Sequence, residues 1–128
     1  MTRFLLDTDT LSLFRRGDPE IIQRLRITRP EEIAITVISV EEQLAGWYDQ
    51  IRRLTVPFLA SFRILPFTEL AMTRYDDLRG QRLNVGANDL KIAAIALECG
   101  AIIITRNTRD YGRVPNLITE DWSRKSEV

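Results

Sequence analysis

Short apolar segments alternate with helix-like segments along the whole chain, and this alternation leaves few choices of fold. Apolar runs predict strands at residues 3–6, 32–36, 63–67, 101–105 and 117–119. Periodic patterns predict helices at residues 9–16, 18–26, 37–62, 68–83 and 90–98, with a short helix or turn at 106–111. Strands joined by helices form a parallel sheet covered on both faces. The sequence therefore predicts an α/β fold, a three-layer α/β/α sandwich around a mainly parallel sheet of four to five strands.

Length and composition fit a single domain. The chain has 128 residues, of which 45% are apolar and 28% charged, as in an ordinary globular core. We interpret residues 1–128 as one domain with a polar tail at about residues 121–128. No apolar run approaches the roughly 20 residues that span a bilayer, so no membrane association is expected. Cys99 is the only cysteine, which rules out an internal disulfide and favours a cytoplasmic setting.

The absence of histidine narrows the chemistry that the chain can perform. Without histidine there is no Ser-His-Asp or Cys-His catalysis, and one cysteine is too few for an ordinary zinc site. If the chain is an enzyme, its chemistry rests on carboxylates, which favour hard cations such as Mg²⁺ or Mn²⁺. The formal net charge of zero gives no global signature of a nucleic-acid-binding protein.

Several acidic and amide side chains are predicted to lie at one edge of the sheet. Asp7, Asn107 and Asp110 follow predicted strands, and the carboxyl ends of parallel strands meet at one edge. Glu42 lies about two turns past the second strand and reaches this edge only if its helix leans back. Asp89 lies at the start of the helix before the fourth strand. Because like charges repel unless a cation or proton intervenes, this set predicts a metal site.

Each acid also has a purely structural interpretation. Asp7 or Asp9 fits the N-cap of the first helix, and Asn88 or Asp89 fits the N-cap of the helix over residues 90–98. Glu42 fits an exposed position on a helix surface. Taken one at a time, these acids favour the structural interpretation. Their common predicted edge favours the metal site.

Four segments resemble, in order, the motifs of PIN-domain ribonucleases, in particular the VapC-type toxins of bacterial toxin–antitoxin pairs. They are residues 4–12, 36–46, 86–94 and 105–111, and together they cover nearly the whole chain. Each segment alone is a weak signal, whereas the combination is specific. The spacing to the glycine at position 46 selects Glu42 over Glu41 as the second acid.

The resemblance implies a Mg²⁺- or Mn²⁺-dependent endoribonuclease that hydrolyses RNA, forms a homodimer and is inhibited by a cognate antitoxin. It implies that Asp7, Glu42 and Asp89 hold the metal. Asn107 or Asp110 would complete the catalytic set.

Two positions depart from the family pattern. Asp9 stands where these toxins often have Asn, and we interpret it as a helix cap or a neighbour of the metal ligands. Asn107 stands where many PIN domains have a carboxylate, although its carbonyl oxygen can still act as a ligand. Thr105 corresponds to a hydroxyl that lies near the site in the family.

Arginine side chains supply local positive charge that the net charge hides. We predict that the following arginines contact RNA phosphates: Arg79, Arg82, Arg106, Arg109 and Arg113.

Two other classes of function remain open from the sequence. Asp7-Thr8-Asp9 also resembles the opening of haloacid-dehalogenase-like phosphatases, with Asp7 as the nucleophile. That family expects Thr or Val where Leu11 stands, and its late acidic pair does not fit the helical pattern around Asp76 and Asp77. The third class is a non-catalytic PIN-like binding module. Its aromatic surface or core would contain Trp47, Tyr48, Phe58, Phe62 and Tyr75.

Overall fold

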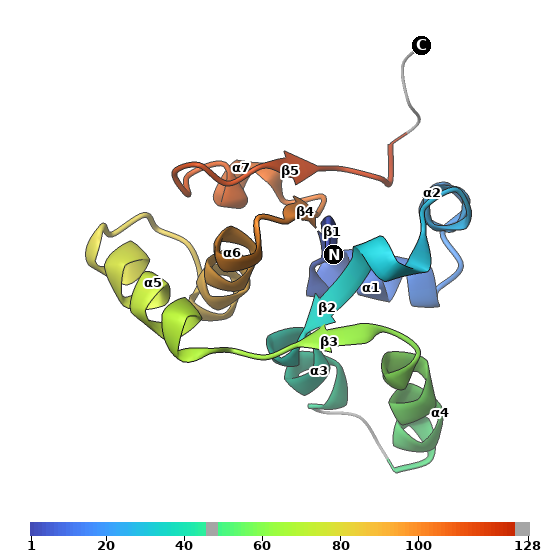
Figure 1. Cartoon of the computed structure of the whole chain (residues 1–128). Coiled ribbons are helices and arrows are strands. Elements are labelled where there is room, and N and C mark those ends of the chain that lie inside the picture. Colours follow the sequence, from blue (N-terminus) through green and yellow to red (C-terminus); the bar gives the residue numbers. More distant parts are fainter. Residues whose placement is uncertain (46–48, 125–128) are drawn as a thin grey trace.

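The computed structural model describes residues 1–45 and 49–124, with the backbone alone for residues 49–54. In this part of the chain, five parallel strands form one sheet in the order β3-β2-β1-β4-β5 (Figure 1). The strands are β1 (Phe4–Leu6), β2 (Ile33–Thr36), β3 (Arg63–Leu65), β4 (Ile102–Ile104) and β5 (Thr119–Glu120). The predicted α/β fold with a parallel sheet is therefore confirmed.

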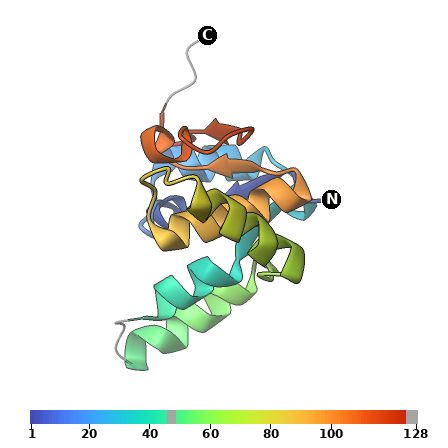
Figure 2. The ribbon, with the colours of Figure 1, turned by 90° about the vertical axis from the view of Figure 1, so that its left-hand side faces the viewer.

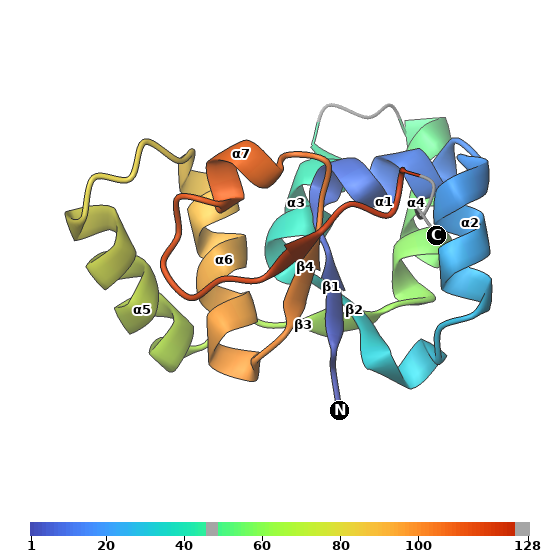
Figure 3. The same cartoon turned by 90° about the horizontal axis from the view of Figure 1, so that it is seen from above.

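Helices cover both faces of the sheet. They are α1 (Thr8–Arg15), α2 (Pro19–Arg26), α3 (Val37–Leu44), α4 (Asp49–Ala60), α5 (Glu69–Gly80), α6 (Ala87–Cys99) and α7 (Thr108–Tyr111), with the 3₁₀ turn η1 (Pro30–Glu32) before β2. Helices α5 and α6 pack on one side of the sheet, and α1, α2 and α4 lie on the other (Figure 3). The continuous helix predicted over residues 37–62 is wrong at its middle, because α3 ends at Leu44 and α4 begins at Asp49. Pro57 lies inside α4.

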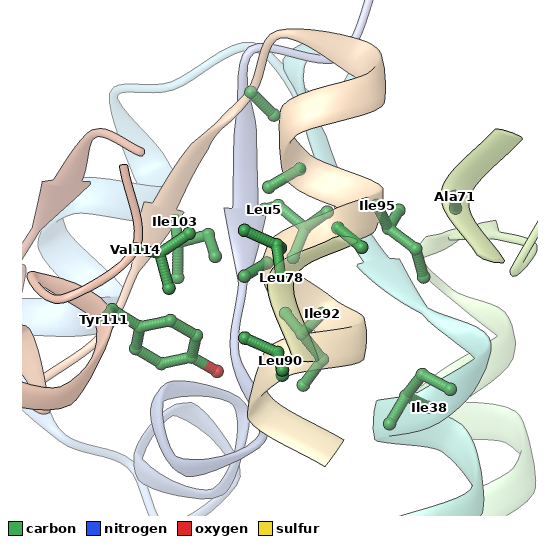
Figure 4. Close-up of a cluster of buried hydrophobic side chains, with 14 residues drawn as sticks. Leu5, Ile38, Ala71, Leu78, Leu90, Ile92, Ile95, Ile103, Tyr111 and Val114 are labelled. Carbon is green, nitrogen blue, oxygen red and sulfur yellow. The ribbon is translucent and has the colours of Figure 1, made fainter. Parts of the chain in front are cut away.

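Alternate residues of the central strands feed two separate hydrophobic clusters. Leu5 and Ile103 point into the cluster beneath α5 and α6, which Figure 4 shows in close-up. Phe4, Leu6 and Ile104 point into the cluster beneath α1, α2 and α4. This is the period of two that a pleated strand imposes, and both faces of β1 are fully covered as expected for an interior parallel strand.

Local sequence signals set most helix ends. The Asp18 carboxylate accepts hydrogen bonds from the first backbone amides of α2, and Pro19 stands at its first position, as predicted. Gly100 ends α6 in the left-handed region at φ 69°. The predicted cap of α6 is wrong, because Gly86 is the N-cap residue and α6 begins at Ala87. Asp89 therefore lies inside the first turn, where its side chain is available for another role.

The last part of the described chain differs from the predicted polar tail. The Trp122 side chain is only 1% exposed, and its ring packs edge-on against Phe4 at a centroid distance of 5.0 Å. Burial of this large ring fixes the chain well beyond residue 120, so the tail prediction is wrong at Trp122. Residues 125–128 lie outside the described residues.

Helices α3 and α4 extend together beyond the sheet, drawn in teal and green in Figure 2. The β1 and β4 strands run away from the N-terminal end of the chain in Figure 3, and α1, α6 and α7 begin at the far end. Side chains from the first turns of these helices therefore meet at the carboxyl edge of the sheet.

Candidate active site

A cavity of about 370 Å³ lies at the carboxyl edge of the sheet, and we call it the acidic cavity. Its lining residues are Asp7, Thr8, Asp9, Ser12, Glu42, Asp89 and Asn107. They come from the start of α1, from α3, from the first turn of α6 and from the residue that caps α7. Four of the seven residues are acids and none is basic. The predicted gathering of acids at one edge is thus found, with Asp110 outside the lining.

Asp7 caps α1 and also lines the acidic cavity, so its structural role and a role in the site do not exclude each other. Its Oδ1 accepts a hydrogen bond of 2.8 Å from the backbone N–H of Thr10 and caps α1. The side chain is only 4% exposed, and this desolvation raises the pKa of Asp7 to about 6. Hydrogen bonds from Thr105 and Thr10 act against that rise, and the charge of Asp9 adds to it.

Glu42 reaches the cavity because α3 leans against α1. The Thr8 hydroxyl donates a 2.7 Å hydrogen bond to Glu42 Oε1. The Thr8 and Ser39 hydroxyls also lie 3.0 Å apart, which links the first turn of each helix. The condition that the sequence left open, a helix that leans back over the strand ends, is therefore met.

Asp89 is held by a buried phenol. The Tyr111 hydroxyl donates a 3.2 Å hydrogen bond to Asp89 Oδ1, and the Tyr111 ring is fully buried in the cluster beneath α6 (Figure 4). Burial raises the pKa of Asp89, the Tyr111 hydrogen bond lowers it, and the charges of Glu42 and Asp110 raise it again. Glu42 and Asp110 therefore lie close enough to Asp89 for their charges to disfavour its ionised form.

Asn107 and Asp110 form a local unit at the start of α7. The Asn107 side chain caps α7 through the backbone N–H of Asp110, and its amide Nδ2 donates to Asp110 Oδ2 at 3.0 Å. Arg113 Nη1 donates to Asp110 Oδ1 at 3.1 Å, on the other side of the carboxylate. Asn107 therefore lines the acidic cavity while Asp110 stands behind it.

Asp9 and Thr105 occupy supporting positions. Two guanidinium nitrogens of Arg106 donate to the two oxygens of Asp9 at 2.8 and 2.9 Å. The Thr105 hydroxyl is buried and accepts a hydrogen bond from the backbone N–H of Asn107 at 2.9 Å. Asp9 is neutralised by Arg106 and is less available to a cation than Asp7 or Glu42.

None of the five arginines predicted to contact phosphate lines the acidic cavity. Arg106 pairs with Asp9, Arg79 with Asp76, and Arg113 with Asp110. Arg82 and Arg109 are exposed. Three of these five arginines therefore form ion pairs with carboxylates.

Four residues at or beside the cavity were not predicted from the sequence: Thr8, Ser12, Ser39 and Tyr111. Thr8 and Ser12 lie one residue and five residues after Asp7, so helical periodicity past the first acid could have suggested them. Tyr111 lies 22 residues from Asp89 and carries no local signal of the contact.

The lining fits a divalent cation in its chemistry. Among the described residues, however, no three acidic or thiol side chains lie close enough together to hold an ion as they stand. Carboxylate oxygens are the ligands that Mg²⁺ and Mn²⁺ prefer, and a cation would relieve the repulsion between Asp89 and Glu42. The donor set therefore fits such an ion in its chemistry.

Fold and site together define an α/β domain with an acid-lined cavity at the carboxyl edge of a parallel sheet. The chain belongs to the PIN-domain family, whose sequence model matches residues 4–117. No helix in the described part of the chain is long and apolar enough to cross a membrane.

Several characterised proteins are similar to this chain over nearly its full length. The tRNA(fMet)-specific endonuclease VapC of Salmonella typhimurium is 27% identical over 95% of this chain and 99% of its own length. A DNA-bound VapBC structure from the same organism superposes with a TM-score of 0.85, at 26% identity and with coverage of 95% and 99%. A toxin–antitoxin complex from Klebsiella pneumoniae gives a TM-score of 0.73 at 31% identity, with coverage of 90% and 95%. The predicted kinship with VapC-type toxins is thus confirmed.

Proposed function

We propose that this PIN domain is a metal-dependent endoribonuclease toxin that hydrolyses RNA phosphodiester bonds and is inhibited by a cognate antitoxin. The observation that carries the proposal is the gathering of Asp7, Glu42 and Asp89 around one cavity at the carboxyl edge of the sheet. The names of the similar proteins support it, since they include ribonucleases and toxin–antitoxin complexes. In this proposal, residues 1–128 form a single domain.

Asp7, Glu42 and Asp89 would hold Mg²⁺ or Mn²⁺, with Asn107 or Asp110 as a further oxygen donor. The ion would supply charge stabilisation at the phosphate and lower the pKa of a water molecule. The protein side chains orient these donors: Thr8 fixes Glu42, and Tyr111 fixes Asp89. Such fixed orientation places the reacting groups before the substrate arrives.

Two further features belong to the proposal. The antitoxin partner follows from the likeness to VapBC complexes, the RNA substrate from the ribonuclease names of the relatives, and the homodimer from the family resemblance alone. RNA as substrate would place the activity in the cytoplasm.

The test is cleavage of a labelled total tRNA fraction by the purified chain with Mg²⁺ or Mn²⁺. We expect Asp7→Asn and Asp89→Asn to lose at least about 100-fold in rate, because each removes a charged ligand. Asp77→Asn is the matched control, because Asp77 is exposed on α5 and lines none of the cavities described here. Equal rates for all four proteins would overturn the proposal.

The two other classes of function are not favoured. Asp76 and Asp77 are exposed on α5, far along the chain from any strand end, so they do not form a phosphatase acidic pair. Of the aromatic residues considered for a binding surface, Phe58, Phe62 and Tyr75 pack against the two hydrophobic clusters. Trp47 and Tyr48 lie outside the described residues.

A further inference from the structure

A second cavity, of about 270 Å³, adjoins the acidic cavity and is basic in character. It is lined by Ser12, Arg15, Arg16 and Gln43, and we call it the basic cavity. Ser12 lines both cavities, so the two share a wall on α1. Helix α1 runs from the carboxyl edge of the sheet toward α4 (Figure 3). The acidic cavity lies at the start of α1, and the basic cavity lies toward its end.

The wall between the two cavities is tied together by polar contacts. Gln43 is buried, and its amide Nε2 donates to the Ser12 hydroxyl at 2.8 Å. Arg15 donates to Gln43 Oε1 at 3.4 Å and to the Thr55 hydroxyl at 2.6 Å. The Arg15 guanidinium also lies 5.6 Å from the centre of the Phe58 ring. Arg15 is therefore held in one position, which lowers the entropy lost when a ligand binds there.

Arg16 supplies the second positive charge of the basic cavity. Its side chain is exposed, and no ion pair of Arg16 is found in residues 1–45 or 49–124. This differs from Arg106, which is nearer to the acids and is held by both oxygens of Asp9. Arg16 is thus a cation available to a ligand that enters from the acidic cavity.

Building on the proposed ribonuclease function, we propose that Arg15 and Arg16 bind a backbone phosphate of the RNA, a few nucleotides from the bond held in the acidic cavity. Arg16, the C-cap residue of α1, follows Asp9 by seven positions, a rise of about 10 Å. At roughly 3.4 Å of axis per phosphate of a stacked strand, that length corresponds to about three phosphates. A guanidinium matches a phosphate through paired N–H donors, and a contact at this distance adds attraction beyond the acidic lining.

The experiment measures binding of fluorescein-labelled hexauridylate by anisotropy at several salt concentrations, with Mg²⁺ present. All variants carry Asp89→Asn so that the RNA is not cleaved. We expect Arg16→Gln to weaken binding about 5-fold at 0.1 M salt and to lower the salt slope by about 0.7, the value for one phosphate contact. Arg16→Lys keeps the charge and the slope.

Arg26→Gln is the matched control, because it removes the same charge from an exposed position on α2 that lines no cavity described here. An equal loss with Arg26→Gln, or no loss with Arg16→Gln, would overturn the phosphate site. Hexaglutamate is tested in parallel as an acidic peptide. Loss of hexaglutamate binding equal to the loss of hexauridylate binding would assign the cavity to acidic protein segments and overturn the RNA assignment.

Cleavage and binding measurements together distinguish failure of the phosphate site from failure of the ribonuclease proposal. Wild-type cleavage of tRNA together with unchanged hexauridylate binding by Arg16→Gln would overturn the phosphate site alone. Absence of both cleavage and hexauridylate binding would overturn both.

Discussion

Two polar cavities of this protein differ in the charges of the residues that line them. The acidic cavity, about 370 Å³, is lined by four acids and no basic residue. A larger cavity of about 530 Å³ lies beside α2 and the start of β1, and we call it the α2 cavity. Its lining mixes four arginines with two glutamates, and one of the arginines, Arg24, pairs with Glu120 and covers the Trp122 ring. The proposed active site is therefore the smaller of the two cavities, and concentrated like charge rather than size distinguishes it.

The difference separates a region that stabilises the fold from the proposed active site. Around the α2 cavity, Arg24 pairs with Glu120, and the Arg3 and Arg24 guanidinium groups lie over the Phe4 and Trp122 rings, so these contacts stabilise the folded chain. In the acidic cavity, burial opposes the ionised form of Asp7, so the folded chain is less stable than it would be with a neutral group. We therefore expect removal of the Trp122 ring and removal of the Asp7 charge to change stability in opposite directions.

The largest expected effect is loss of stability from Trp122→Ala near the α2 cavity. The Trp122 side chain is 1% exposed and packs against Phe4 and Arg24, so its removal leaves a void in the core. We expect the free energy of unfolding to fall by about 3–5 kcal/mol, measured by urea denaturation. Trp122→Phe is the control and should lose less. A change below about 1 kcal/mol for Trp122→Ala would show that this region does not stabilise the fold.

The second effect is a gain of stability in the acidic cavity, measured on metal-free protein. The Asp7 pKa is about 6 in the folded chain and 3.8 in the unfolded chain, so the folded state binds more protons between these values. Stability should then fall as pH rises from about 4 to 6, by up to about 3 kcal/mol. Asp7→Asn keeps the helix cap, removes this pH dependence and should raise the free energy of unfolding at pH 7.

Thermal unfolding in EDTA across pH 3.5 to 7.5 checks this expectation. Asp77→Asn serves as the control for removal of an exposed acid. If the stability of the wild type rises with pH in this window, relative to that of Asp7→Asn, then folding does not raise the pKa of Asp7.

A smaller effect should follow from Tyr111→Phe. This change removes the hydroxyl that donates to Asp89 Oδ1 and leaves the ring in the core. We expect a loss of about 1 kcal/mol in stability, together with several-fold weaker Mn²⁺ binding measured by calorimetry, because Asp89 loses its orientation. Tyr75→Phe is the matched control, since the half-buried Tyr75 ring packs against Phe67. Equal Mn²⁺ affinity in wild type and Tyr111→Phe would show that Tyr111 only fills space.

The sequence was sufficient to predict the sheet and the edge where the acids meet. Alternating apolar and periodic segments identify parallel strands, and the carboxyl ends of such strands share an edge by geometry alone. Asp7 and Asn107 could therefore be placed from chain position. Glu42 and Asp89 needed the family pattern, because their positions depend on how α3 and α6 lean over the sheet.

The individual contacts could not be predicted in the same way. Arg106 and Asp9 are 97 residues apart, and their pairing depends on where two helix starts meet. The same holds for Tyr111 with Asp89 and for Arg15 with Gln43. Local propensity carries no information on such pairs, which packing of whole helices decides. Arg106 and Arg113, for example, were predicted to contact phosphate, whereas in the structure each pairs with a carboxylate.

The smallest expected effect tests whether ion pairs or packing stabilise the α2 cavity. Arg24 Nη2 lies 3.5 Å from Glu120 Oε1, and both side chains are about one third exposed, so solvent screens the pair. The guanidinium also lies 5.0 Å from the centre of the Trp122 ring. We expect Arg24→Gln to cost less than about 1 kcal/mol in urea denaturation, and Glu120→Gln to cost less still. A loss for Arg24→Gln as large as that for Trp122→Ala would mean that charge pairing, rather than the buried ring, stabilises this region.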